Sequence, residues 1–107
     1  MVTRRDLKLP YQAVQSAHAA IQFQHEHQEL SKLWYTQSNY LAFLTVANEE
    51  ELEKLIRKAE AKGITHSIFR EPDIGNEITA VAFEASNDAK RITSSCRMMG
   101  KEYNNNN

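Results

Sequence analysis

The sequence predicts a single α/β domain built on a four-stranded mixed sheet with helices on both faces. Short apolar runs of strand length alternate with longer stretches of helical periodicity, in the order strand, helix, strand, helix, strand, strand, helix. Right-handed crossovers between such strands place helices on both faces of the sheet. Three glycines and two prolines are too few to punctuate two domains. We therefore expect one domain over residues 1–103, and a disordered low-complexity tail at Asn104–Asn107.

The first strand is expected near residues 1–5, followed by a helix over Tyr11–His27. Pro10 fits the first turn of this helix, where a missing backbone N–H costs nothing. Spacings of i, i+3, i+4 and i+7 predict one buried stripe, formed by Val14, Ala17, His18 and Ile21.

The connection over residues 28–39 is polar and rich in turn residues, with Leu33 and Trp34 as its anchors. Trp34, Tyr35 and Tyr40 are three aromatic residues around a polar segment of a short chain. Because aromatic residues are enriched at interface cores, we expect a homodimer.

The nearly continuous apolar run 41–46 predicts a strand buried on both faces. Asn48 and Glu51 have the spacing of a capping box, so a helix begins there and extends to about Lys62. Gly63 is its expected C-cap. The buried stripe of this helix is predicted to comprise Leu52, Leu55, Ile56 and Ala59.

The last part of the chain predicts a third strand over 64–69 and a turn-rich loop over 71–76. A fourth strand over 78–84 and a closing helix over 87–96 follow, the helix being capped by Ser86 or Asn87.

Composition excludes some classes of protein. A net charge of −1 argues against a general nucleic-acid coat protein, although Lys90, Arg91, Arg97 and Lys101 suggest a local basic face. A solvated surface is the alternative interpretation of these cations. A single cysteine, Cys96, allows no intrachain disulfide and favours the reducing cytoplasm. No run approaches the roughly 20 apolar residues of a membrane span, and residues 1–5 do not begin a signal peptide.

Several short motifs occur in a recognisable order. The chain begins with an R-x-D-L motif at Arg4, Asp6 and Leu7, followed by Q-x-x-H-A at Gln15, His18 and Ala19. Later come the acidic run Glu49-Glu50-Glu51-Leu52, a helix-ending glycine, and Thr79-Ala80-Val81-Ala82 in the fourth strand. In this order, and over nearly the whole chain, the motifs resemble those of the type II (archaeal and eukaryotic-type) peptidyl-tRNA hydrolases.

The resemblance implies hydrolysis of the ester that joins a peptide to the tRNA 3′ end. Tyr11 stands where the family carries a catalytic lysine. Glu71 matches the family's loop aspartate best, and Asp73 is the alternative. The candidate catalytic residues are Glu71, Asp73, Tyr11, His18 and Thr79, and the candidate substrate-binding residues are Arg4, Asp6, Gln15 and Arg70.

Each candidate also has a simpler interpretation. A carboxylate on a loop beside a strand end can activate water, but the segment 71–73 also has ordinary turn chemistry. A histidine on an apolar stripe, such as His18, is more often a core residue than a catalyst. Gln15 is also consistent with a solvent position. Tyr11 can bind an oxyanion or stack on a base, and packing at a helix start is the alternative. His25, His27 and His66 do not complete a metal ligand set, so we expect no metal and no cofactor.

Two functions follow from these patterns. The first is a divergent peptidyl-tRNA hydrolase, and the alternative is a non-catalytic relative that binds RNA, a nucleotide or a protein in the same cleft. Either function predicts that the first helix and the loop after the third strand converge. Gln15 or His18 is then expected within about 10 Å of Glu71 or Asp73, measured between Cα atoms.

Overall fold

The computed structural model describes residues 1–101, in which a mixed sheet has five strands rather than the predicted four. The predicted tail, Asn104–Asn107, lies outside the described residues. In chain order the elements are β1 (Val2–Arg4), α1 (Leu9–Glu26), α2 (Gln28–Gln37), β2 (Leu44–Val46), α3 (Glu49–Lys62), β3 (His66–Glu71), the 3₁₀ turn η1 (Pro72–Ile74), β4 (Glu77–Phe83), α4 (Asn87–Ile92) and β5 (Arg97–Met98).

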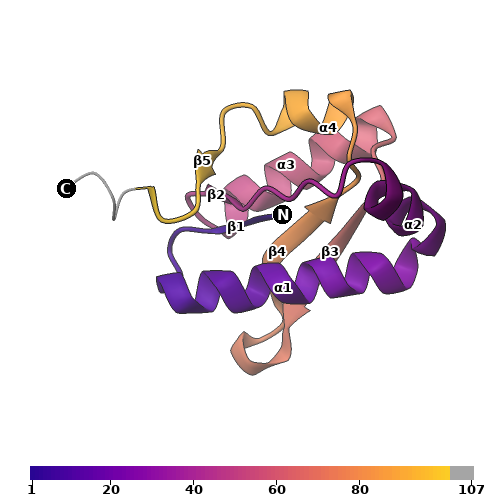
Figure 1. Ribbon diagram of the computed structural model, residues 1–107. Helices are drawn as coiled ribbons and strands as arrows, with labels where there is room; N and C mark the ends of the chain where they lie inside the picture. The colour runs from indigo at the N-terminus through magenta and orange to yellow at the C-terminus, as the bar shows by residue number, and fades with distance from the viewer. Residues whose placement is uncertain (102–107) are drawn as a thin grey trace.

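The strands lie in the order β3-β4-β1-β2-β5. Only β1 and β2 run parallel, and each of the other neighbouring pairs is antiparallel. Helix α1 crosses one face of the sheet, while α3 and α4 lie on the other (Figure 1). This arrangement confirms the predicted single α/β domain with a mixed sheet. No helix within residues 1–101 has the length and apolar character needed to cross a bilayer.

The predicted last helix ends early, and a fifth strand follows it after a turn. The Ser86 hydroxyl caps α4 as expected, but the helix ends at Ile92 rather than at residue 96. The hydroxyls of Thr93 and Ser94 donate to carbonyls of the last turn, at 2.8 Å and 2.9 Å. Such side-chain bonds compete with helical propagation, so the chain leaves the helix and adds β5 beside β2.

The second strand is shorter and less buried than predicted. Strand β1 offers only Val2–Arg4 as partners, so the parallel ladder begins at Leu44. Leu41 and Phe43 precede it as exposed residues, which corrects the prediction of a strand buried on both faces over 41–46.

The predicted turn-rich connection is the helix α2. Its sequence is rich in Gln, Glu, Leu and Lys, which are good helix formers, and this propensity outweighed the polar pattern. None of its residues is fully buried. The Trp34 indole N–H donates to the carbonyl of Tyr40 at 2.7 Å, so Trp34 is an anchor as predicted, whereas Leu33 is 51% exposed and is not.

Helix α3 matches its prediction closely. Asn48 accepts a hydrogen bond from the Glu51 N–H at 3.0 Å, and Gly63 ends the helix in the left-handed conformation. Its buried residues are Leu52, Leu55, Ile56 and Ala59, and the first three of these form a core with Val2, Ile78 and Val81.

The stripe predicted for α1 is wrong. Val14 is 50% exposed and Ile21 66% exposed, and Ala17 and His18 also face outward. The buried residues of the helix are instead Gln12, Gln15, Ser16 and Ala19. The sheet face beneath α1 carries small and polar side chains such as Thr3, Thr79 and Ala80. Thr79 hydrogen-bonds to Gln15, and Ala80 packs against Ala19. The interface between α1 and the sheet is therefore a layer of small and polar side chains.

Candidate active site

Four side chains from α1, β3 and β4 form one hydrogen-bonded cluster. The amide of Gln15 donates to Glu71 Oε1 at 3.0 Å, and the phenol of Tyr11 donates to the same oxygen at 3.3 Å. The hydroxyl of Thr79 donates to the amide oxygen of Gln15. The contact between Gln15 and Glu71 confirms that the first helix and the end of the third strand converge.

The first turn of α1 sets the positions of Tyr11 and Gln15. These residues are four apart and therefore share one face of the helix. The Gln12 amide donates to the carbonyl of Leu7 at 2.7 Å, which fixes the helix start to the chain leaving β1. Pro10 occupies the first turn, as expected from the sequence.

An irregularity in the β3–β4 ladder aims Thr79 at α1. Phe69 pairs with Ala80 and Arg70 pairs with Ile78, so Thr79 is an extra residue on β4. Such a bulge leaves one residue outside the ladder and redirects its side chain. The hydroxyl of Thr3 donates to the Thr79 carbonyl at 2.7 Å, which satisfies this backbone oxygen. The sequence gives no signal for this role of Thr3.

The loop after β3 orients Glu71 and turns Asp73 outward. The second carboxylate oxygen of Glu71 accepts the backbone N–H of Asp73 at 3.4 Å, which caps η1. Gly75 and Asn76 both have positive φ, and the Asn76 N–H donates to the Glu71 carbonyl at 2.9 Å. Asp73 itself is exposed. Of the two candidate carboxylates, Glu71 is therefore the one held by the cluster.

The cluster shifts the pKa values of two groups. The hydrogen bond from the Gln15 amide is the main cause that lowers the pKa of Glu71, and partial desolvation opposes it. The Asp73 N–H, the Tyr11 phenol and nearby His18 lower this pKa further. Desolvation and the adjacent Glu71 charge raise the pKa of Tyr11. At neutral pH the site therefore combines an ionised carboxylate with a protonated phenol.

Arg4 and Asp6 lie beside the cluster as an internal ion pair. The buried guanidinium of Arg4 donates to Asp6 at 2.9 Å and 3.0 Å, to Glu77 at 2.7 Å and to the carbonyl of Ile78 at 3.1 Å. The bonds to Asp6 are the main cause that raises the pKa of Arg4. Glu77 is the ladder partner of Glu71, so Arg4 compensates a negative charge opposite the site.

In the described part of the chain, neither His18 nor Arg70 hydrogen-bonds to the cluster. The imidazole of His18 stacks on the ring of Phe69, with centroids 4.5 Å apart and planes 4° from parallel. Phe69 was not singled out in the sequence, where it is one apolar residue of a strand. Arg70 is exposed and donates to the Asn76 carbonyl at 3.3 Å. Within residues 1–101, no three His, Cys, Asp or Glu side chains are grouped as a metal ion would require.

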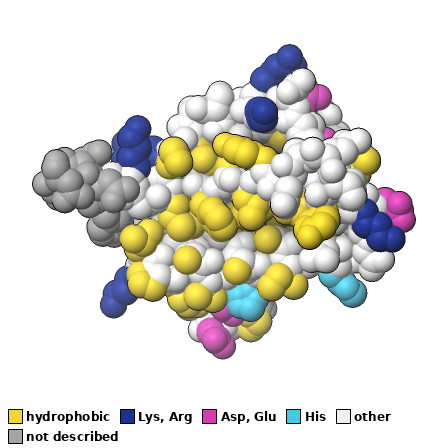
Figure 2. All heavy atoms as spheres, viewed as in Figure 1, with side chains coloured by type: hydrophobic (Ala, Val, Ile, Leu, Met, Phe, Trp, Pro, Cys, Tyr) yellow, Lys and Arg dark blue, Asp and Glu magenta, His cyan; other side chains and the backbone are white. Residues whose placement is uncertain are grey.

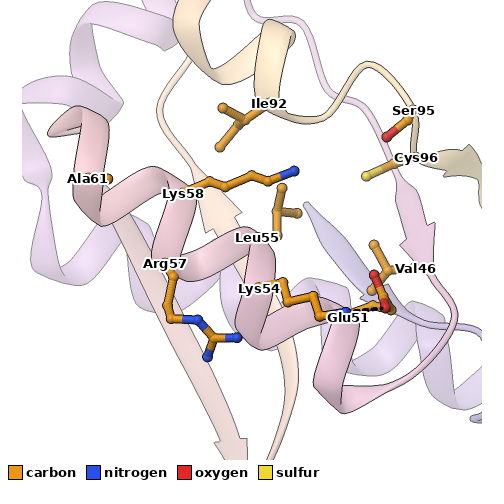
Figure 3. Close-up of a pocket in the computed structure, with 10 residues that line it drawn as sticks. All are labelled: Val46, Glu51, Lys54, Leu55, Arg57, Lys58, Ala61, Ile92, Ser95 and Cys96. Carbon is orange, nitrogen blue, oxygen red and sulfur yellow. Dashed lines mark hydrogen bonds and ion pairs between the residues drawn. The ribbon is translucent and has the colours of Figure 1, made fainter.

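A separate hollow lies between α3 and the segment after α4 (Figure 3). It includes none of the candidate residues. Its lining comprises Val46, Glu51, Lys54, Leu55, Arg57, Lys58, Ala61, Ile92, Ser95 and Cys96. Burial raises the pKa of the Cys96 thiol, which disfavours the thiolate needed by a nucleophile.

Comparison with known proteins identifies a family. A family model described as peptidyl-tRNA hydrolase PTH2 matches residues 1–99, which include every candidate site residue. Among curated proteins, none matches the chain at a significant level.

Proposed function

Because the chain belongs to the peptidyl-tRNA hydrolase PTH2 family, we propose that it hydrolyses the ester bond between a peptide and the 3′ end of tRNA. The observation that carries this proposal is the carboxylate of Glu71, held by Gln15 and Tyr11 at the protein surface. Ester hydrolysis needs an oriented water and donors for the developing oxyanion. In this cluster, Glu71 can orient the water and Tyr11 can donate to the oxyanion.

Glu71 orients the attacking water in this mechanism. Its Oε1 atom already accepts two side-chain donors, whereas Oε2 accepts only the long 3.4 Å bond from Asp73 and has lone pairs left for a water. A carboxylate with a lowered pKa is a weak base. Glu71 therefore positions the water and accepts its proton only as the water oxygen bonds to the ester carbon. The same proton then passes to the ribose oxygen of tRNA as the ester C–O bond breaks, which releases the peptide acid and the tRNA hydroxyl.

Tyr11 and Thr79 complete the machinery in different ways. The Tyr11 phenol is protonated near neutral pH, and its single O–H donates to Glu71 in the structure. By turning away from Glu71, the same O–H can donate a hydrogen bond to the oxyanion of the tetrahedral intermediate. Thr79 has no exposed surface with which to contact a substrate. It acts as a positioning residue, because its hydroxyl fixes the Gln15 amide with the N–H side toward Glu71.

A hydrolysis assay on a peptidyl-tRNA tests the proposal. Glu71→Gln keeps the shape of the side chain and removes its charge, and should lower kcat/KM about a hundred- to a thousandfold. Asp73→Asn should have a much smaller effect, because Asp73 contacts Glu71 through its backbone N–H, which the substitution keeps, and its side chain is exposed. Glu60→Gln, at an exposed position of α3, is the matched control and should leave the rate unchanged.

The same assay can refute the proposed hydrolase activity. If the wild type cleaves peptidyl-tRNA no faster than the Glu71→Ala, Asp73→Ala double variant, the chain is not a hydrolase of this substrate. Retention on immobilised tRNA at low salt would then identify it as a binding relative.

We also infer that two copies associate. Tyr35 is 68% exposed and Tyr40 70% exposed, and Figure 2 shows hydrophobic side chains gathered along α1 and the segment crossing above it. Soluble monomers rarely expose a continuous apolar patch beyond a few hundred Å². A second copy of the chain is the occupant we assign to this surface. Light scattering at tens of micromolar should report a dimer, and a monomeric mass would refute the assignment.

The proposed activity also suggests where the protein works. Peptidyl-tRNA arises during translation, and the single cysteine within the chain is a free thiol. Both points favour the reducing cytoplasm.

A further inference from the structure

The His18 ring has an arrangement unlike that of a catalytic histidine. It is exposed on α1 and lies parallel to the Phe69 ring at 4.5 Å. The histidine rings that hydrogen-bond within residues 1–101 are those of His27 and His66. A general acid or base needs a partner that orients its ring and hydrogen-bond reach to the reacting group. His18 instead has one ring face packed against Phe69 and the other toward solvent.

The stack lies directly beside the Glu71 carboxylate. His18 is three residues after Gln15, about 4.5 Å further along the helix axis. Phe69 is two residues before Glu71, so both side chains project from the same side of β3. On the face shown in Figure 2, histidine and acidic side chains meet where α1 passes the loop between β3 and β4. A ligand stacked on His18 would therefore lie within reach of the carboxylate.

An imidazole with one face packed on Phe69 and the other face exposed can stack on an unpaired nucleobase. Bases at single-stranded ends stack on aromatic side chains, histidine included, and this stacking tolerates any base because each has a π face. Phe69 fixes the plane of the imidazole in advance, which reduces the ordering required on binding.

We propose that the His18–Phe69 stack binds the terminal unpaired base of the RNA substrate and so places the ester at Glu71. The proposal rests on the proposed function, since it takes the substrate to be a tRNA ester. It assigns His18 to binding rather than to proton transfer.

A binding titration without any ester tests the stack alone. The probe is the unacylated trinucleotide with the 3′-terminal sequence of tRNA. Relative to wild type, His18→Ala should weaken binding about 5- to 150-fold, the loss expected for one stacked base. His18→Tyr keeps an aromatic face and should bind nearly as wild type does. His25→Ala, at another exposed position of the same helix, is the matched control and should bind normally.

Kinetics on peptidyl-tRNA should give the same ranking. His18→Ala should raise KM with little change in kcat, because the lost interaction is the same in the ground state and the transition state. Equal loss of kcat in His18→Ala and His18→Tyr would identify a catalytic imidazole and overturn the proposal. Failure of the wild type to bind the trinucleotide, or undiminished binding by His18→Ala, would also overturn it.

The outcomes separate this inference from the proposed function. A wild type that binds the trinucleotide through His18 but does not cleave peptidyl-tRNA supports the stack and refutes the hydrolase. A wild type that cleaves the ester while His18→Ala keeps full trinucleotide affinity supports the hydrolase and refutes the stack. If His18→Ala weakens the binding of a free peptide and not that of the trinucleotide, the surface binds the peptide part of the substrate and the proposal is refuted.

Discussion

The two faces of the sheet differ in how they hold their helices (Figure 1). On one face α3 buries Leu52, Leu55 and Ile56 against an apolar core. On the other, α1 buries Gln12, Gln15 and Ser16, each with no exposed surface. Apolar burial contributes stability but places no polar group in a defined direction. The α1 face therefore defines the site geometry, and the α3 face provides the stability that tolerates buried polar groups.

Gln15 shows what the polar face achieves. A buried amide is costly unless both its donor and its acceptor are satisfied. Here Thr79 donates to the Gln15 oxygen and Glu71 accepts from its nitrogen, so only one orientation of the amide satisfies both neighbours. The carboxylate is consequently held by a group that cannot turn over without losing two hydrogen bonds.

The largest effect is expected on the apolar face. Leu52→Ala deletes a fully buried side chain from the α3 core and should lower the free energy of unfolding by about 2–5 kcal/mol. The rate per folded molecule should not change, because α3 contributes no side chain to the cluster. Urea denaturation and an active-site-normalised assay measure the two quantities. A large fall in the normalised rate would show that the two faces are not separable.

The next effect is expected on the polar face. Thr79→Val removes the donor to Gln15, and should lower kcat/KM about a hundredfold by misplacing the amide that holds Glu71. The free energy of unfolding should fall by only about 0.5–1.5 kcal/mol, the usual net contribution of one hydrogen bond. Thr79→Ser restores the hydroxyl and should recover most of the rate. Equal losses of rate in the Val and Ser variants would count against a positioning role.

Substitutions of Tyr11, also on the polar face, should change turnover less than Thr79→Val does. Tyr11→Phe removes a neutral donor that makes one long hydrogen bond, of 3.3 Å, to the ionised Glu71, and should lower turnover about tenfold. Tyr11→Lys introduces the residue type that the family carries there, and should raise turnover, because an ammonium gives Glu71 and the oxyanion a charged donor. A Lys variant slower than the Phe variant would show that the helix start directs this side chain elsewhere.

The acid limb of the pH profile reports the Gln15–Glu71 bond. The folded-state pKa of Glu71 is lowered, so its contribution to stability is complete above the unfolded value, about 4.3, and is lost as pH falls through the folded value. Activity that needs the carboxylate should likewise persist below pH 4.3. Gln15→Met removes the main cause of the shift, so the acid limb should move to higher pH. An unmoved limb would mean that another group titrates there.

The sequence predicted the apolar face better than the polar one. The stripe of α3, its Asn48 cap and its Gly63 end were confirmed, because apolar burial leaves a period that can be read directly. The same rule failed for α1, where Val14 and Ile21 face outward and glutamines face inward. A periodicity rule assumes that helices bury their large apolar side chains, and this helix buries small and polar ones instead.

The site was predicted in part for a related reason. Motif resemblance brought Gln15, Glu71 and Thr79 together, and the structure confirms that they form one cluster. The β4 bulge, the Thr3 bond to the Thr79 carbonyl and the Phe69 stack were not predicted, since each depends on register between distant segments. Strand β5 was missed because two residues between turns carry no periodic signal.

The smallest effect tests whether the polar layer is complete. The Ser16 hydroxyl and the Gln12 side-chain oxygen are buried one helical turn apart, and neither has a hydrogen-bond partner within residues 1–101. Ser16→Ala removes a buried polar group and improves helix propensity, so it should raise the free energy of unfolding by about 0.5–1 kcal/mol. Ala17→Ser, at an exposed position of the same helix, measures the difference in helix propensity between alanine and serine alone. It should lower the free energy of unfolding by a few tenths of a kcal/mol. If Ser16→Ala destabilises the protein by more than this control, buried water bridges Ser16 and Gln12. The hydrogen-bonded layer then extends from Thr79 to the start of α1, and the contrast between the two faces is greater than the side-chain contacts alone indicate.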